Sequence, residues 1–135
     1  MTSPRMLLTA LALVVVGAGC AAEAAEVEAS GPRVVGAEET VELLDARDDL
    51  VVIDVRTPQE YDEGALAASE LIDIQAADFR QRIGELDRDV AYVVYCRSGN
   101  RSAQAVTIMA DLGFTELYDA GGFADLAAAG AGLAG

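Results

Sequence analysis

Short apolar runs alternate along this chain with segments whose apolar residues recur at helical spacing. The runs at 50–55 (LVVIDV) and 91–95 (AYVVY) are rich in β-branched and aromatic residues. Such runs predict strands that are buried on both faces of a sheet. The segment 102–112 instead places apolar residues at i, i+3, i+4 and i+7, which is the spacing of one helix face, and Gly113 is well placed to end that helix.

Shorter elements complete the pattern. Further strands are predicted at 34–35, 71–74 and 116–118, and further helices at 38–46, 58–62, 77–86 and 123–128. Strands that alternate with helices indicate an α/β domain with a mainly parallel sheet. In such sheets the functional groups collect at the carboxyl ends of the strands, and Asp54, Arg56 and Cys96 fall there.

Composition narrows the chemistry and the partners. The chain has 135 residues, which suits a single domain, and a formal net charge of −14. So acidic a surface excludes nucleic acid and anionic membrane surfaces as general partners. All nine basic residues are Arg and there is no His, so cysteine–histidine catalysis is excluded. We expect neither a metal ion nor a cofactor. Arg97 and Arg101 stand out against this background because they lie close to a cysteine.

Residues 1–20 have the order of a secretory signal peptide. Arg5 precedes an apolar run at 6–16, and Gly and Ala residues follow before Cys20. The run is shorter than the roughly 20 residues that span a bilayer, so a permanent transmembrane helix is the weaker interpretation. Small residues directly before Cys20 resemble the lipobox of bacterial lipoproteins, whose cysteine is lipidated, although that motif usually has a branched residue where Gly17 stands.

An ordinary signal peptide, cut for example after Ala22 or Ala25, is the alternative to lipidation. Either route exports the domain, so we expect an exported cell-envelope protein, lipid-anchored on the periplasmic or extracellular face of a membrane. The acidic, Ala-rich segment 21–31 is interpreted as a flexible tether. The folded domain is predicted at 32–128, followed by a flexible, Gly/Ala-rich tail at 129–135.

Cys96 ends the second apolar run and opens a polar loop, CRSGNR. A cysteine is a nucleophile only as the thiolate, so a catalytic cysteine needs a lowered pKa. Three sources of positive potential are present: loop N–H groups that form an anion-binding nest, the N-terminus of the helix from Ser102, and the charges of Arg97 and Arg101. The alternative is a buried, inert cysteine, which would normally lie inside an apolar pattern, so the catalytic interpretation is favoured.

The remaining loop residues suit the same purpose. Gly99 permits a backbone with positive φ, and the small side chains of Ser98 and Asn100 leave the centre of the loop open. A loop that stabilises a thiolate also holds an anionic substrate or a bound persulfide. We therefore predict that the residues from Arg97 to Ser102 bind the substrate, with one of the two arginines free to bond loop carbonyls instead.

Three motifs in order resemble the rhodanese-like sulfurtransferases. They are the loop from Cys96 to Ser102, the segment 52–56 (VIDVR) with Pro58, Glu60, Tyr61 and Gly64 after it, and the pair Gly121-Gly122 followed by Phe123. The resemblance spans about 34–126, essentially the whole predicted domain. The sequence departs from the family at Ala65-Leu66, where His and Ile are usual, and this departure concerns packing more than chemistry.

The resemblance implies a rhodanese-like fold with a five-stranded sheet flanked by helices. It also implies an enzyme, a thiosulfate sulfurtransferase in which Cys96 carries a persulfide cradled by loop amides. With the basic Arg97 as its second residue, the loop resembles that of thiosulfate-using members more than that of mercaptopyruvate-using ones. The expected partners are a small sulfur donor and a thiol or cyanide acceptor, in ping-pong transfer by a monomer.

Some alternatives stay open. Asp54 either orients the loop at the strand ends or serves the structure alone, and Arg56 is interpreted as a structural partner of Glu60, four residues on. A non-catalytic carrier of sulfane sulfur, or a partner-docking module, is the second function. A phosphatase or arsenate reductase is the third, but those enzymes place five residues between the cysteine and the arginine, where this loop has four.

Overall fold

The computed structural model describes residues 31–135. The predicted signal peptide, Cys20 and almost all of the predicted tether lie outside the described residues. In chain order the elements are β1 (Arg33–Val34), α1 (Ala37–Ala46), β2 (Val51–Asp54), α2 (Pro58–Glu63), β3 (Glu70–Leu71), α3 (Phe79–Gly84), β4 (Ala91–Cys96), α4 (Asn100–Asp111), β5 (Glu116–Gly122) and α5 (Phe123–Ala128). Within the described part, no helix is both long and apolar enough to cross a membrane.

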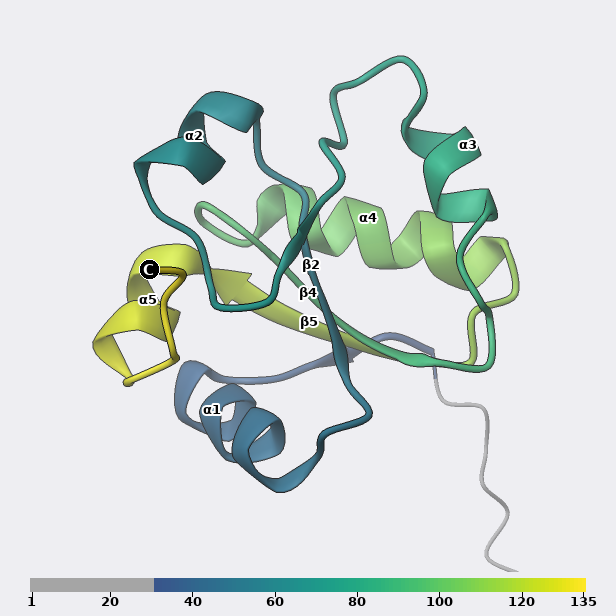
Figure 1. The fold of residues 1–135 in the computed structure, drawn as a ribbon. Coiled ribbons are helices and arrows are strands. Elements are labelled where there is room, and N and C mark those ends of the chain that lie inside the picture. The colour runs from purple at the N-terminus through teal and green to yellow at the C-terminus, as the bar shows by residue number, and fades with distance from the viewer. Residues whose placement is uncertain (1–30) are drawn as a thin grey trace, which may run out of the picture.

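The strands form one sheet in the order β1-β5-β4-β2-β3, and every neighbouring pair is parallel. Parallel neighbours need crossover connections, and the helices that supply them lie on both faces of the sheet (Figure 1). The predicted α/β fold, a five-stranded parallel sheet flanked by helices, is confirmed. The central strand β4 is buried along its whole length, as its unbroken apolar run predicts.

Two hydrophobic cores lie on the two faces of the sheet, because successive strand residues point to opposite sides. On one face, α3 and α4 cover a core that includes Ile53, Val94 and Cys96. On the other face, α1 and α5 cover a core that includes Val52 and Tyr95 (Figure 1). The two neighbours at the end of β4, the tyrosine and the cysteine, therefore serve different faces.

The helix after β4 begins earlier than the sequence predicts. α4 starts at Asn100 rather than Ser102, and Gly99 is its N-cap with a φ of 102°. A glycine adopts this left-handed backbone without the steric cost that a Cβ would bring. The chain therefore passes from strand to helix within three residues, which keeps the helix N-terminus close to the end of β4.

The last strand is longer than predicted and contains a bulge. Val94 of β4 pairs with Asp119, but the next residue, Tyr95, pairs with Gly121. The strand takes in one extra residue at this point and continues to Gly122. The apolar pattern ends before the glycines, so sequence periodicity could not predict this extension.

The C-terminal segment, predicted as a flexible tail, lies along the loop after α2. Ala67 N–H donates to Gly132 O at 2.8 Å, and Ala134 N–H donates to Ala65 O at 2.9 Å. Ala131 is buried in the core that α1 and α5 cover. Composition could not predict these contacts, because main-chain pairing requires no particular side chain.

Candidate active site

The loop that follows β4 wraps its main chain around the sulfur of Cys96. The Gly99 N–H lies 2.9 Å from Sγ, and the N–H groups of Ser98 and Ser102 also donate to the sulfur. These donors form a nest of the kind that binds anions. The N-terminus of α4 adds the positive end of its dipole at the same place.

The surroundings of Cys96 act on its thiol in opposite directions. The residue is fully buried, and burial raises the pKa of the thiol. The hydrogen bond with the Ser102 hydroxyl and the three main-chain N–H groups outweigh burial, so the pKa of Cys96 lies below its ordinary value. These donors therefore stabilise the thiolate, the nucleophilic form of cysteine, more than in an ordinary cysteine and without any imidazole.

Arg101 projects from the start of α4 and is held by Glu60 of α2. Its NH1 and NH2 groups bond the two carboxylate oxygens of Glu60 at 2.7 and 2.8 Å. Glu60 also caps α2, because its side chain accepts from the N–H of Thr57 at 3.0 Å. Arg101 lowers the pKa of Glu60 to about 2. Much of the positive charge of Arg101 is therefore compensated within the protein.

Arg97, Ser98 and Asn100 are exposed on the outer side of the loop. Within residues 31–135, Arg97 takes part in no salt bridge. A hollow of about 770 Å³ opens beside the loop, and Arg97 and Arg101 line it together with Glu60 and other residues. The described residues hold no cluster of His, Cys, Asp and Glu that could bind a metal ion.

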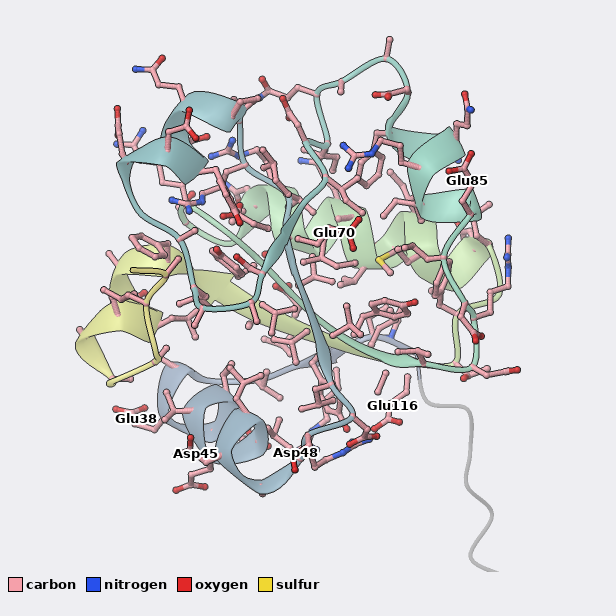
Figure 2. All side chains as sticks on the ribbon, in the orientation of Figure 1. Glu38, Asp45, Asp48, Glu70, Glu85 and Glu116 are labelled. Atoms are coloured by element: carbon pink, nitrogen blue, oxygen red, sulfur yellow. The ribbon has the colours of Figure 1, made fainter. Side chains whose placement is uncertain are left out.

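The arginines at this hollow contrast with the rest of the surface. The acidic side chains labelled in Figure 2 come from α1 and the turn after it, from β3, from the end of α3 and from β5. They are Glu38, Asp45, Asp48, Glu70, Glu85 and Glu116. In a chain of net charge −14, an anion is attracted only where arginines gather, and the hollow is such a place.

Asp54 and Arg56 form a buried ion pair at the end of β2. The guanidinium NH2 and Nε donate to the carboxylate at 2.6 and 2.9 Å, and NH2 also donates to Gly64 O at 2.7 Å. The Tyr95 hydroxyl donates to Asp54 at 2.6 Å. Burial and this bond raise the pKa of Tyr95 to about 12. The Arg56 guanidinium stacks 4.4 Å from the ring centre of Phe123.

The predicted pairing of Arg56 with Glu60 is wrong. Arg56 precedes Thr57, the N-cap of α2, so the spacing of four residues does not place the two side chains on one helix face. Arg56 pairs with Asp54 instead, and Glu60 pairs with Arg101. The sequence thus indicates the wrong carboxylate for Arg56 and no ion-pair partner for Arg101.

The glycine pair at the end of β5 is the floor of the loop. A Cβ on Gly122 would lie 2.7 Å from the Arg97 carbonyl oxygen, closer than real atoms approach. The Cβ of a residue at Gly99 would lie 3.7 Å from the Gly121 Cα. The main chain of the loop therefore rests on β5, and the second glycine is required there because any side chain would displace the loop.

One buried side chain at the site was missed by the sequence analysis. Asp119 accepts a hydrogen bond of 2.6 Å from the hydroxyl of Ser102, which itself lies 3.6 Å from the sulfur of Cys96. The only signal in the sequence is its position at the end of the last strand, just before the glycine pair. An aspartate at such a place is commonly a turn residue, and the bulge that aims it inward leaves no mark in the sequence.

Comparisons with known proteins agree with this geometry. The family model described as "Rhodanese-like domain" matches residues 36–129. The chain is 34% identical over 77 residues to thiosulfate sulfurtransferase PspE of Escherichia coli, covering 56% of this chain and 72% of PspE. It is 33% identical over 81 residues to the putative sulfurtransferase YtwF of Bacillus subtilis, covering 60% of this chain and 77% of YtwF.

A solved structure supports the same relationship. The crystal structure of a rhodanese-related protein from Thermoplasma volcanium superposes with a TM-score of 0.65 at 32% identity, covering 76% of this chain and 97% of that one. The range matched by the family model takes in strands β2 to β5, the loop around Cys96 and the glycine floor beneath it. The matched range, the sheet and the loop together establish that this chain belongs to the rhodanese-like family.

Proposed function

We propose that this protein is a thiosulfate sulfurtransferase that carries sulfane sulfur as a persulfide on Cys96. The observation that carries the proposal is the ring of main-chain N–H groups around Sγ, with the Gly99 N–H at 2.9 Å. This ring favours the thiolate before the reaction and offers the same donors to an anionic persulfide after it. Relatives named as thiosulfate sulfurtransferases support the choice of donor.

The first half-reaction loads the enzyme. The Cys96 thiolate attacks the outer sulfur of thiosulfate, a new S–S bond forms, and the S–S bond of thiosulfate breaks. The bonding pair leaves with sulfite. In the second half-reaction cyanide or a thiol attacks the terminal sulfur of the persulfide, and the Cys96 thiolate is released. The enzyme alternates between two covalent states, which predicts ping-pong kinetics.

Arg97 is the residue we assign to the donor's anionic sulfonate group. It lines the hollow beside the loop, and it has no salt-bridge partner within the described part of the chain. Arg101 lines the same hollow, but Glu60 already holds both ends of its guanidinium. Arg97 therefore offers the uncompensated charge, whereas Arg101 helps to shape the loop.

A non-catalytic carrier of sulfane sulfur is the second candidate, and the burial of Cys96 favours it. The residue is 0% exposed and does not line the hollow, so a donor reaches Sγ only when the loop moves. Turnover with thiosulfate and cyanide separates the two candidates. An enzyme forms thiocyanate over many cycles, whereas a carrier takes up one sulfur and releases it slowly.

The direct test is mass spectrometry after incubation with thiosulfate. The peptide that contains Cys96 should gain the mass of one sulfur atom, and cyanide should remove that mass and yield thiocyanate. Cys96→Ser should show neither change. If the intact protein gains no sulfur and forms no thiocyanate, the proposed function is wrong.

We further propose that aryl phosphates are not substrates. Four residues separate Cys96 from Arg101, one fewer than in the related phosphatases and arsenate reductases. A ring of N–H groups one residue shorter leaves room for a sulfur atom but crowds a tetrahedral phosphate. The check is hydrolysis of an aryl phosphate by the same preparation, which should stay far below its rate of sulfur transfer.

Export to the cell envelope, with a lipid anchor at Cys20, is also part of the proposal. It rests on the apolar run and small residues before Cys20, which lie outside the described residues. Lipidation with more than one acyl chain gives stable anchoring, so Cys20→Ala should release the protein from the membrane fraction. Equal amounts of soluble exported protein for both forms would instead support an ordinary signal peptide.

A further inference from the structure

Asp119 is a buried carboxylate that the reaction described above does not use. Its side chain is almost fully enclosed, with the whole residue 6% exposed, at the bulge of β5. Its Oδ1 accepts from the Ser102 hydroxyl at 2.6 Å and from the Gly121 N–H at 3.2 Å. Both donors are neutral, and among residues 31–135 Asp119 has no salt bridge. Burying a carboxylate without a cation beside it costs free energy, so such a group is a candidate for a functional role.

The hydrogen bonds between Asp119 and the sulfur of Cys96 run in one direction. An ionised carboxylate only accepts, so the Ser102 hydroxyl donates to it. That hydroxyl has a second acceptor, the Gly99 carbonyl oxygen, but at 3.0 Å rather than 2.6 Å, and the charge-assisted bond is the stronger. While Cys96 is protonated, the Ser102 oxygen therefore accepts from its thiol, 3.6 Å away, and the chain runs from S–H to O–H to carboxylate. Once the thiol proton has passed along this chain, the Ser102 hydroxyl donates to the thiolate, and that bond lowers the pKa of Cys96.

Repulsion between like charges favours keeping one proton within this chain of hydrogen bonds. If the Cys96 thiolate and the Asp119 carboxylate were both ionised, two negative charges would face each other across one serine in a buried site. Of the other charged groups nearby, Arg97 is exposed on the outer side of the loop, and the rest are already paired. Arg101 acts on the sulfur from α4 but is bonded to Glu60. The pair of Asp54 and Arg56 serves the opposite face of the sheet, where Tyr95 lies.

We propose that Ser102 and Asp119 form a proton relay for Cys96, in which the thiol proton passes through the Ser102 hydroxyl to Asp119 as sulfur is loaded. The inference rests on the proposed sulfur transfer. Loading then reads: thiol plus carboxylate plus thiosulfate gives persulfide anion plus carboxylic acid plus sulfite. When the acceptor removes the terminal sulfur, the thiolate takes the proton back from Asp119 through Ser102. No proton is lost to water, and the site keeps the same total charge before and after loading.

Asp119 touches neither the sulfur nor the substrate, so it acts as a positioning residue through Ser102. If Asp119 takes up the thiol proton, its replacement changes the number of protons released per sulfur loaded, whereas a merely structural role would leave that number unchanged. Sulfur loading is therefore followed in weakly buffered solution with a pH indicator, at a pH where alkylation shows the thiol to be protonated. Mass spectrometry gives the sulfur loaded in the same samples, and the sulfite formed contributes equally to every variant.

The expected result is a difference of about one proton per sulfur loaded. Wild-type protein should release the fewest protons, and Asp119→Asn should release about one more, because an amide cannot take the thiol proton. The matched control is Asp111→Asn, which removes an exposed carboxylate at the far end of the same helix as Ser102 and should behave as wild type. Ser102→Ala should resemble Asp119→Asn, since it interrupts the relay.

A measurement on wild type alone covers the case in which Asp119→Asn does not fold. The infrared difference spectrum between loaded and free enzyme should gain the C=O stretch of a protonated carboxylic acid. Equal proton release by wild type and Asp119→Asn, or a wild-type spectrum without that band, overturns the relay while leaving sulfur transfer intact. Failure of the wild-type protein to take up sulfur overturns the proposed function first.

Discussion

Two buried aspartates lie toward the carboxyl ends of β2 and β5 and have contrasting surroundings. Asp54 of β2 accepts from the guanidinium of Arg56 and from the hydroxyl of Tyr95. Asp119 of β5 accepts from the hydroxyl of Ser102 and from one main-chain N–H. The first carboxylate has a cation against it, and the second has only neutral donors.

The difference follows from the faces of the sheet. Strand side chains alternate, so the end of β4 sends Tyr95 to one core and Cys96 to the other. Asp54 meets the tyrosine, which ties β2 to β4. Asp119 is aimed by the bulge at Ser102 on α4, beside the cysteine. Both carboxylates are buried, and what distinguishes Asp119 is that it has no cation beside it and lies next to the nucleophile.

The largest effect is expected from removing the sulfur of Cys96, on the face of the sheet where Asp119 lies. Cys96→Ser should lose all sulfur transfer, because an alcohol is not ionised at neutral pH and no persulfide can form on it. The variant should fold, since serine is nearly the same size. Thiocyanate formation and the melting curve are the two measurements. Residual transfer above background in Cys96→Ser would mean that another group carries the sulfur.

The second effect separates the two aspartates by stability. Asp54→Asn leaves the guanidinium of Arg56, which is 4% exposed as a residue, without its counter-charge. Breaking a buried ion pair from one side costs about 3–5 kcal/mol in the free energy of unfolding. Asp119→Asn keeps a neutral hydrogen-bond partner for Ser102 and should cost about 1 kcal/mol. Urea unfolding measures both, and equal losses would contradict the comparison.

The third effect concerns the loop over the Asp119 face. Gly122→Ala places a methyl group 2.7 Å from the Arg97 carbonyl oxygen, so the loop around Cys96 has to shift. Displacements of about 1 Å at a reacting centre cost up to about a hundredfold in rate, so kcat/KM should fall about tenfold to a hundredfold. Gly36→Ala is the control, because a Cβ there meets nothing within 4 Å. An unchanged kcat/KM would show that the glycine floor does not position the loop.

The fold was predictable because its signals are local. The runs at 50–55 and 91–95 became β2 and β4 since continuous β-branched residues suit strands covered on both faces. The loop after Cys96 was visible for the same reason, since sulfur, glycine and arginine lie within a few consecutive residues. Element ends were less predictable, and β5 shows why: a bulge and two glycines carried the strand past its apolar residues.

The partners of the charged residues were not predictable, because they depend on contacts between distant segments. Ser102 and Asp119 are 17 positions apart, and Glu60 and Arg101 are 41 apart. The pairing expected for Arg56 assumed helical spacing across a position where the helix has not yet begun. Local sequence therefore indicates which residues are chemically active, and the sheet topology decides which of them meet.

The smallest effect tests the second ion pair, that of Arg101 and Glu60, which lies at the rim rather than in the core. Arg101 and Glu60 keep side-chain exposures of 20% and 22%, against 5% and 0% for Arg56 and Asp54. Water screens such a pair, so Glu60→Gln should lower the free energy of unfolding by about 1 kcal/mol at neutral pH. The matched control is Asp111→Asn, which removes an exposed carboxylate without breaking any salt bridge described for residues 31–135.

The pH dependence of this stability difference tests whether it arises from the charge of Glu60. The pKa of Glu60 falls from 4.5 to about 2 on folding, so its contribution to stability is fully present above pH 4.5 and is lost as the pH falls through about 2. The gap between wild type and Glu60→Gln should therefore close between these two values, because the protonated Glu60 and the glutamine are then both neutral. Urea unfolding of both proteins at several acidic pH values measures the gap. A gap that stays constant down to pH 2 would mean that glutamine costs stability through packing and that the charge of Glu60 contributes nothing.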